Sequence, residues 1–150
     1  MAGKLHGQQQ QCLTNEEIVA RLEGAGVAPT AQRVAIAQFV LCEADHPTAD
    51  EVEQGVKSKL PVVSRATVYN TLNKLVEAGL LRELRTPFEE SLRYDGNITP
   101  HHHFIDRESR EIIDIAFDDV EISNIDSLKR KYRIDKLCVT IEGSRKSKAS

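Results

Sequence analysis

Apolar residues recur at helical spacing four times in the first eighty residues, and a capping residue precedes each run. Thr14 and Thr48 each stand three residues before a glutamate, which predicts capping boxes at the starts of two helices. Thr30 and Ser64 begin the other two. The apolar stripes of the four helices are Ile18, Val19 and Leu22; Val34, Ala37, Val40 and Leu41; Val52, Val56 and Leu60; and Val68, Leu72, Leu75 and Val76. Glycines or prolines separate the helices.

A strand pattern follows the fourth helix. Residues 80–85 and 91–95 read as two strands, and residues 86–90 read as the turn between them. Short helices followed by a hairpin are typical of a winged helix, so we predict a winged-helix DNA-binding domain over residues 14–95.

The pattern changes after Asp95. Residues 96–100 form a short polar stretch that we interpret as a hinge. Strands are predicted at 101–105, 111–116 and 136–142, with a helix at 118–132. Residues 101–143 thus form a small α/β domain, and the whole chain is of the α+β class. Such a small sheet buries little surface alone, so we expect this domain to pair with a second copy in a homodimer. Residues 1–13 and 144–150 are expected to be flexible tails.

The charge, the apolar runs and the cysteines of the chain bear on which classes of protein it can belong to. The net charge is −3, so composition alone does not indicate nucleic-acid binding. No apolar run is long enough to span a bilayer and the polar opening segment does not resemble a signal peptide, so we expect no membrane partner and a cytoplasmic location. The three cysteines, Cys12, Cys42 and Cys138, form no C-x-x-C pair, which argues against a disulfide framework and a four-cysteine zinc site. We interpret Cys42 and Cys138 as small buried apolar residues.

The fourth helix has an outward face made of residues that contact DNA well. Arginine and lysine bind phosphates, asparagine reads base edges, and a helix start can bind phosphate through its N–H groups. The candidates on this face are Ser64, Arg65, Thr67, Tyr69, Asn70, Asn73 and Lys74. Arg82, Arg85 and Arg93 add positive charge to the wing. An ordinary solvated helix face is the alternative.

The triplet His101-His102-His103 is the strongest chemical signal. On a strand, alternate residues share a face, so His101 and His103 can converge on one ion while His102 points away. Asp95, Asp114 and His46 are the nearest further candidates. Imidazoles with carboxylates suit Fe²⁺, Mn²⁺ or Zn²⁺.

Two other classes fit such a cluster. A small non-haem iron or zinc enzyme would need an open coordination position and a placed acid or base, and no Ser or Cys nucleophile has a recognisable partner. A metal buffer would need no groove-facing helix. Metal-dependent, salt-sensitive DNA binding distinguishes a repressor from both.

Three segments resemble the ferric uptake regulator superfamily: His46-Pro-Thr-Ala-Asp50, Ser64-Arg-Ala-Thr-Val-Tyr-Asn-Thr-Leu72, and residues 92–114. The resemblance extends from about Ile18 to Ile141 and is most marked to the peroxide-sensing (PerR) branch and the neighbouring iron-response (Irr) branch. It implies a metal-dependent transcription repressor that binds a palindromic double-stranded operator as a homodimer and is not an enzyme.

The resemblance also implies roles for single residues. The regulatory metal site of the peroxide-sensing branch uses three histidines and two aspartates, which correspond to His46, Asp95, His101, His103 and Asp114. Fe²⁺ or Mn²⁺ is the implied ion, and Zn²⁺ is possible in purified protein. In that branch bound Fe²⁺ reacts with peroxide and nearby imidazoles are oxidised, which points to His46 and His101. Arg33 and Tyr69 correspond to residues near DNA.

This sequence departs from the family at its cysteines. Many members hold a structural zinc with two C-x-x-C pairs, whereas here Asp106 and Ser109 replace the first pair and no cysteine follows Cys138. We therefore expect no structural Cys₄ zinc, and a second domain held together by packing alone. Missing cysteines and a full histidine triplet are also features of Irr-like proteins. The alternative is thus a haem- or iron-responsive regulator in which His101, His102 and His103 contact haem.

Overall fold

The computed structural model of the chain describes residues 12–147. It divides into two compact units, and the division falls between Ile98 and Thr99. This point lies within residues 96–100, whose role as a hinge stays a prediction. Of the predicted tails, residues 1–11 and 148–150 lie outside the described residues, while Leu13 packs against the apolar core of the N-terminal unit.

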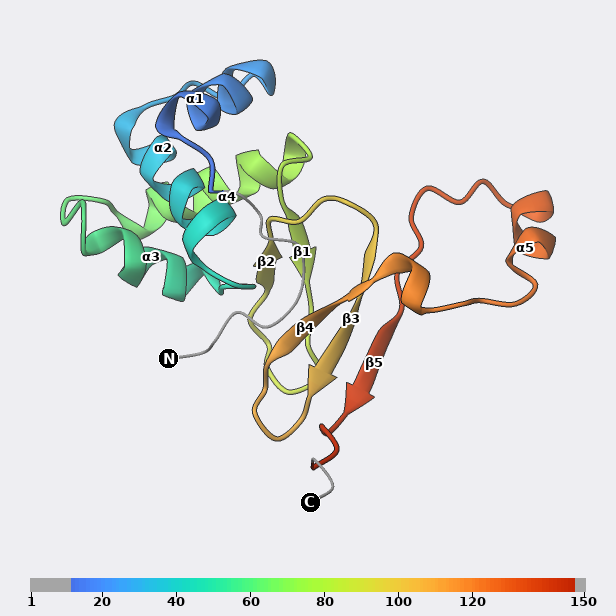
Figure 1. Ribbon diagram of the computed structural model, residues 1–150. Coiled ribbons are helices and arrows are strands. Elements are labelled where there is room, and N and C mark those ends of the chain that lie inside the picture. The colour runs from blue at the N-terminus through green and yellow to red at the C-terminus, as the bar shows by residue number, and fades with distance from the viewer. Residues whose placement is uncertain (1–11, 148–150) are drawn as a thin grey trace. The chain divides into compact units, whose positions relative to one another are not determined.

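The N-terminal unit begins with helices at the predicted places (Figure 1). These are α1 (Asn15–Gly24), α2 (Ala31–Gln38), α3 (Ala49–Lys57) and α4 (Arg65–Glu77). Thr14 and Thr48 form the two predicted capping boxes, and the side chains of Thr30 and Ser64 cap the other two helices. Polar caps therefore satisfy N–H groups at all four helix starts.

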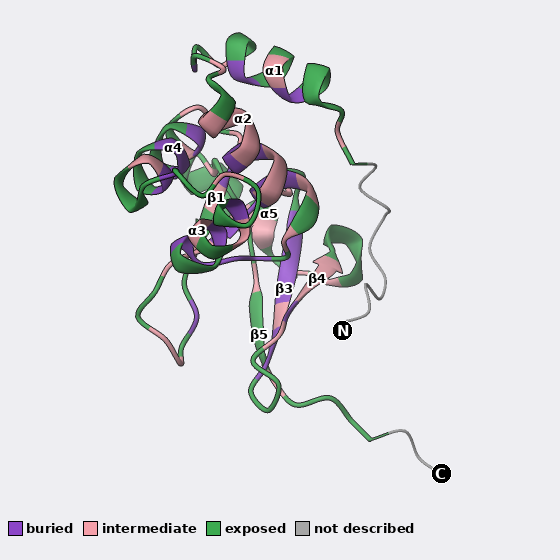
Figure 2. Ribbon diagram, turned by 90° about the vertical axis from the view of Figure 1, so that its left-hand side faces the viewer, coloured by how far each residue is buried: buried purple, intermediate pink, exposed green. Residues whose placement is uncertain are grey.

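Helix α2 passes directly into a wider π-helical turn, η1 (Phe39–Glu43). The aromatic ring of Phe39 packs against Gly55 of α3, where a Cβ would lie 2.2 Å from the ring. Only a glycine permits this approach. The apolar residues of the helices form one buried core, whose largest fully buried members include Ile18, Leu22, Ile36, Val52, Leu72 and Leu75. Figure 2 colours every buried residue purple, on the helices as well as on β3.

The wing is a two-stranded antiparallel hairpin of β1 (Arg82–Leu84) and β2 (Arg93–Asp95). Both strands are shorter than predicted. The amide of Tyr94 donates to the carbonyl oxygen of Pro47, and Thr48 pairs with Arg93. Strand β2 is thereby bonded to the segment that contains His46 as well as to β1.

The C-terminal unit contains a three-stranded sheet in the order β4-β3-β5. Strand β3 (His101–Asp106) is central, pairs antiparallel with β4 (Ile112–Ala116) and pairs parallel with β5 (Thr140–Gly143). A 3-10 turn, η2 (Phe117–Asp119), and a short helix, α5 (Ile125–Lys131), occupy the crossover from β4 to β5. Together with the winged helix of the other unit, this sheet confirms the predicted α+β class.

Two predicted elements of this unit are too long. The helix expected at 118–132 is confined to α5, because Asn124 has a left-handed backbone with φ of 64° and no side chain of α5 is buried. The strand expected at 136–142 begins its ladder only at Thr140. The N–H of Val139 donates to the side-chain Nδ1 of His102 and not to a backbone carbonyl of β3, although the Val139 carbonyl oxygen accepts the N–H of His103.

Polar contacts join the chain segments at the end of the sheet where β3 and β5 finish. Asp106 Oδ1 accepts hydrogen bonds from the amides of Glu108 and Ser109, at 2.9 and 3.4 Å. Arg145, just beyond β5, pairs with Asp106 at 3.6 Å and with Glu111 at 2.6 Å. Ion pairs and turn hydrogen bonds therefore lie at the position of the missing cysteines, and the expectation that packing alone holds this domain together stays a prediction.

Within the described residues, no helix has both the length and the apolar character needed to cross a membrane.

Candidate functional site

The C-terminal unit brings together two histidines and one aspartate. His103 lies directly opposite Asp114 in the β3–β4 ladder, and His101 lies two residues earlier on the same face of β3. The Nε2 atoms of His101 and His103 are 2.9 Å apart. They lie 3.5 and 3.4 Å, respectively, from Oδ1 of Asp114. Strand alternation and register thus place three ligand atoms at the corners of a small triangle.

The dimensions of this triangle fit one metal ion. With metal–ligand bonds of about 2.1 Å, neighbouring ligand atoms are separated by about 3.0 Å in octahedral geometry and about 3.4 Å in tetrahedral geometry. The sides of the triangle span this range. Two imidazoles and a carboxylate are a donor set suited to Fe²⁺, Mn²⁺ or Zn²⁺.

The hydrogen bonds of the two imidazoles orient their ligand atoms. Nδ1 of His101 lies 2.7 Å from the carbonyl oxygen of Thr99. Because a carbonyl only accepts, this nitrogen carries the proton, and the lone pair of the ring is on Nε2. Nδ1 of His103 lies 3.8 Å from Sγ of Cys138. Partners of this kind fix the tautomer and orientation of metal-binding histidines.

His102 points to the other face of the sheet, as alternation predicts. Its ring is 1% exposed and stacks on Phe117 with the centroids 4.9 Å apart. Nδ1 accepts the N–H of Val139 at 2.9 Å. This ring therefore packs and bonds within the sheet and does not share the face of His101 and His103.

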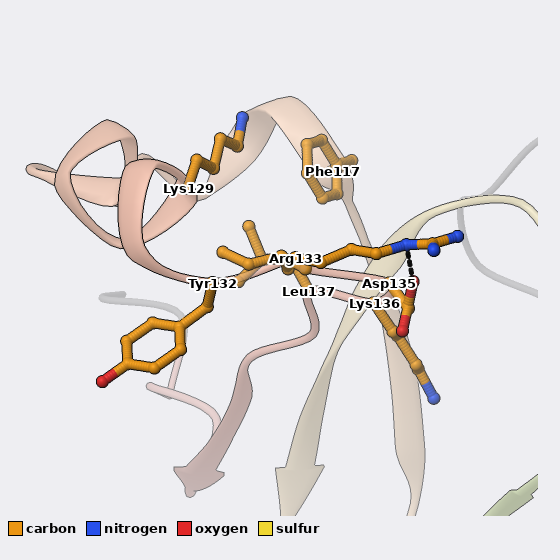
Figure 3. Close-up of a pocket in the computed structure, with 8 residues that line it drawn as sticks. Phe117, Lys129, Tyr132, Arg133, Asp135, Lys136 and Leu137 are labelled. Carbon is orange, nitrogen blue, oxygen red and sulfur yellow. Dashed lines mark ion pairs between the residues drawn. The ribbon is translucent and has the colours of Figure 1, made fainter.

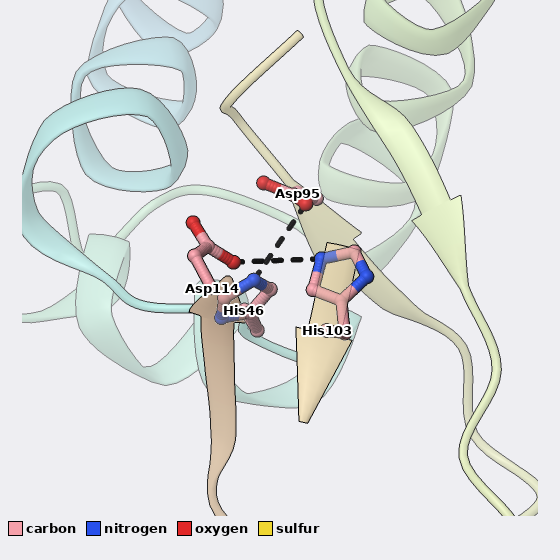
Figure 4. Close-up of side chains that lie close together, drawn as sticks. All are labelled: His46, Asp95, His103 and Asp114. Carbon is pink, nitrogen blue, oxygen red and sulfur yellow. Dashed lines mark ion pairs between the residues drawn. The ribbon is translucent and has the colours of Figure 1, made fainter. Parts of the chain in front are cut away.

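The N-terminal unit contains a second, smaller cluster. Nε2 of His46 lies 3.6 Å from Oδ2 of Asp95, and its Nδ1 lies 2.6 Å from Oδ1 of Asp45. Figure 4 draws the His46–Asp95 pair of this unit and the His103–Asp114 pair of the C-terminal unit. His46 and Asp95 are both buried, with 6% and 5% of their surfaces exposed.

Arg93 anchors the backbone of His46. His46 has a left-handed backbone with φ of 47°, which is uncommon outside glycine. The Arg93 guanidinium donates to the carbonyl oxygen of His46 at 2.9 Å and also binds Glu89. Hydrogen bonding to Glu89 and the charge of Glu51 raise the pKa of Arg93 despite its partial burial, so the residue stays charged. The position of His46 thus depends on strand β2.

Most predicted DNA contacts on α4 are exposed. Val68, Leu72 and Leu75 face the core, while the opposite face carries Ser64, Arg65, Tyr69, Asn70, Asn73 and Lys74, with Thr67 half-buried. Ser64 and Thr67 bond to each other at the N-terminus of the helix. Two predicted contacts outside α4 already have carbonyl partners: Arg33 donates to Ala28 and Arg82 donates to Ile98.

Arg65 is held by acidic residues of α3. Its guanidinium lies 3.0 Å from Asp50 and 3.8 Å from Glu53, and it stands over the ring of Tyr69 at 5.3 Å. The charge of Asp50 and the contact with Tyr69 raise the pKa of Arg65 above its ordinary value. Arg65 and Tyr69 therefore act as a unit.

A sequence model of the Ferric uptake regulator family matches residues 24–142, most of both units. The chain belongs to the ferric uptake regulator family. Its members are metal-responsive transcriptional regulators that bind DNA, act as dimers and are not enzymes. Membership therefore excludes the enzyme alternative.

Two similar proteins are both peroxide-responsive repressors. The chain is 39% identical to the peroxide-responsive repressor PerR of Staphylococcus epidermidis, over 71% of this chain and 72% of that protein. It is 38% identical to the PerR of Staphylococcus aureus (strain USA300), over 68% of each chain.

Solved structures of the family share the fold. The peroxide stress regulator of Campylobacter jejuni is 25% identical, with a TM-score of 0.67 over 89% of this chain and 97% of that one. The ferric uptake regulator of Helicobacter pylori is 19% identical, with a TM-score of 0.73 over 94% and 100%.

A hollow of about 340 Å³ lies elsewhere in the C-terminal unit (Figure 3). Its lining comes from the crossover between β4 and β5, and includes Phe117 of η2, Lys129, Tyr132 and the ion-paired Arg133 and Asp135. His101, His103 and Asp114 are not among its lining residues.

Sequence reasoning missed the residues that support the ligands. Cys138 is exposed and faces His103, so its interpretation as a buried apolar residue is wrong, while Cys42 is half-buried. The parallel pairing of β3 with β5, which places Cys138 beside His103, has no local sequence signal. The hydrogen bond from Arg93 to His46 likewise joins residues 47 positions apart.

Proposed function

We propose that this chain is a metal-dependent DNA-binding repressor that senses peroxide through His46, Asp95, His101, His103 and Asp114. The observation that carries the proposal is the triangle of His101, His103 and Asp114, whose dimensions suit a single divalent ion. The buried His46–Asp95 pair supplies two further ligands of the right chemistry. The 38–39% identity to peroxide-responsive repressors supports the choice of signal.

The proposed ligands come from both units, which suggests how the signal reaches DNA. An ion bound by all five side chains ties the N-terminal unit to the C-terminal unit through residues 96–100. It thereby selects one orientation of the DNA-binding unit from those that the hinge permits. Loss of the ion, or oxidation of a ligand, releases that orientation.

Fe²⁺ or Mn²⁺ is the proposed ion, and Zn²⁺ binds the same donor types in purified protein. Bound Fe²⁺ supplies the electrons that reduce peroxide, whereas Mn²⁺ occupies the site without that reaction. His46 and His101 are the imidazoles that we expect to be oxidised. The Thr99 carbonyl keeps the lone pair of His101 on Nε2.

Helix α4 is the proposed recognition helix. In a homodimer two such helices read two half-sites of a palindromic operator, and the hinge sets their spacing. Arg65, Tyr69, Asn70, Asn73 and Lys74 are exposed for this contact, with Ser64 and Thr67 at the helix start. Arg33 and Arg82 would have to leave or share their present carbonyl partners to bind phosphate.

Haem sensing by the histidine triplet has less support. His102 is buried on the face opposite to His101 and His103, where it is stacked on Phe117. Contact of one haem with all three rings would require His102 to leave this packing and its bond to Val139.

The decisive experiment measures binding of a palindromic, family-type operator to full-length protein loaded with Mn²⁺ or Fe²⁺, before and after peroxide. The proposal expects binding only with metal, and loss on peroxide only for the Fe²⁺ form, with added oxygen at His46 or His101 by mass spectrometry. Metal-independent binding, or peroxide-resistant binding that haem abolishes, would overturn it.

His103→Ala and Asp118→Ala form a matched pair for the same assay. His103→Ala should abolish metal-dependent binding. Asp118 is an exposed carboxylate of the same unit, so Asp118→Ala should behave as the unmodified protein. Equal binding by both variants would contradict the assignment of His103.

A further inference from the structure

Cys12 and Cys42 are brought together in the N-terminal unit although 29 residues separate them. Cys42 lies in the π-helical turn η1, and Cys12 immediately precedes Leu13 at the start of the first helix. The Leu13 amide donates to Sγ of Cys42 at 3.2 Å. The amide of the residue after Cys12 is therefore in contact with the other cysteine.

The sulfur of Cys12 is located by a second, independent contact. Gln38, one helical turn before Cys42, donates from Nε2 to Sγ of Cys12 at 3.4 Å. Residues four apart lie on the same face of a helix, so Cys12 lies over the face that carries Gln38 and Cys42. The apolar side chain of Leu13 packs on the core and anchors the segment.

The two thiols differ in accessibility. Burial, and after it the nearby Cys12 thiol, raises the pKa of the Cys42 thiol, which therefore keeps its proton. Cys12 is exposed, so an oxidant in solution reaches its sulfur directly. One cysteine is open to attack and its neighbour is placed to complete the reaction.

We propose that Cys12 and Cys42 are a second oxidation site of this protein, forming a reversible disulfide on reaction with a hydroperoxide. The Cys12 thiol loses its proton and its sulfur attacks the terminal peroxide oxygen. The O–O bond breaks, a sulfenic acid forms on Cys12, and the other oxygen takes up one proton and leaves as water or alcohol. The Cys42 sulfur then attacks the sulfenic sulfur, and water leaves with the Cys42 proton. Both sulfurs together lose two electrons, and the peroxide gains them.

The disulfide closes a loop from residue 12 to residue 42 and joins the start of α1 to η1. Cys42 is four residues before His46, so the bond restrains the helix end that leads to this histidine. Its formation requires no metal. The inference therefore goes beyond the proposed metal-based sensing and can succeed or fail independently of it.

The test uses the full-length, metal-free protein in chelator, treated with hydrogen peroxide, quenched with an alkylating reagent and digested for mass spectrometry. The expected product is a linked peptide pair containing Cys12 and Cys42, lighter by two hydrogen atoms and reversed by dithiothreitol. It should form equally in a His103→Ala background, which removes a proposed metal ligand. It should be absent in Cys12→Ser, a change at an exposed position that spares the core.

Cys138→Ser is the matched control, since Cys138 is also exposed but lies in the C-terminal unit. This variant should form the Cys12–Cys42 link at the unmodified rate. Separate sulfinic or sulfonic products on each cysteine, a link through Cys138, or links only between two chains would overturn the proposal.

Discussion

His103 lies directly across the β3–β4 ladder from Asp114, with 3.4 Å between its Nε2 and the carboxylate Oδ1. The pairing register alone produces this contact, and the same register places His101 within 3.5 Å of the same oxygen. A shift of one residue would turn both histidines to the face now occupied by His102. The part of the candidate site made by His101, His103 and Asp114 is therefore built into the sheet and does not depend on a loop.

Replacing Asp114 by asparagine should weaken Mn²⁺ binding by at least about 100-fold, because a charged metal ligand becomes neutral. Even the residues that only hydrogen-bond to metal ligands contribute about 10–100-fold to metal affinity. Binding is measured by titration calorimetry on the full-length chain. Asp118→Asn, which removes an exposed carboxylate just beyond β4, should leave the affinity unchanged. Equal affinities for the two variants would remove Asp114 from the ligand set.

Replacing Arg93 by alanine should lower the free energy of unfolding by about 1–3 kcal/mol, since it breaks a hydrogen-bonded charge and leaves the carbonyl of His46 without this donor. It should also weaken Mn²⁺ binding, because His46 loses the contact that holds it beside Asp95. Urea denaturation and calorimetry measure the two effects. Arg85→Ala, an exposed arginine of the same wing, serves as the control and should change neither.

The contacts of Asp106 predict that the stability of the folded chain depends on pH. Hydrogen bonds from Glu108 and Ser109, and the charge of Arg145, lower the pKa of the Asp106 carboxyl below its ordinary value of 3.8. A lowered pKa stabilises the folded chain at pH above 3.8, and this contribution is lost as the pH falls through the lowered folded-state value. Asp106→Asn should therefore reduce the melting temperature at neutral pH and flatten its decline in acid.

Arg145→Ala removes the cation that pairs with Asp106 and Glu111. It should lower the melting temperature at neutral pH by a few degrees, because both carboxylates lose their cation. Lys146→Ala is the neighbouring control. An identical melting temperature for the two variants would show that the ion pairs of Arg145 contribute nothing to stability.

Releasing Arg65 should strengthen DNA binding without regard to sequence. Asp50→Asn removes the nearest carboxylate from its guanidinium and frees one cation to reach phosphate. We expect affinity for random DNA to rise a few-fold and the slope of log K against log salt to steepen by about one charge. Glu16→Gln on α1 is the charge-matched control. Parallel salt plots for both variants would contradict the idea.

Local signals in the sequence account for most of the fold. Thr14, Thr48 and Ser64 act within three residues of their partners, so the helix starts were predictable. Strand alternation likewise predicted that His101 and His103 share a face. The predicted helix through Asn124 was wrong, because α5 buries no side chain and Asn124, a residue type that adopts the left-handed conformation readily, interrupts the helix before Ile125.

Contacts between residues far apart in the sequence could not be predicted from these local signals. Arg93 reaches His46, Cys138 reaches His103, and Arg145 reaches Asp106, and each contact depends on which strands become neighbours. The cysteines illustrate this best. Their number and spacing argued against a disulfide framework and a four-cysteine zinc site, yet the packing of Leu13 against the core places Cys12 close to the helix face that carries Cys42.

The central position of β3 has a consequence for how this protein can change over generations. The ligand-bearing strand is bonded on one side to β4 and on the other to β5. Within the segment between those two strands, α5 contributes no proposed ligand and buries no side chain, whereas Phe117, Cys138 and Val139 at the ends of the segment contact the histidines of β3. Insertions and substitutions around α5 can therefore accumulate without moving His101, His103 or Asp114. The middle of the crossover is the part of the C-terminal unit in which new surface properties can arise while the sensing chemistry is inherited intact.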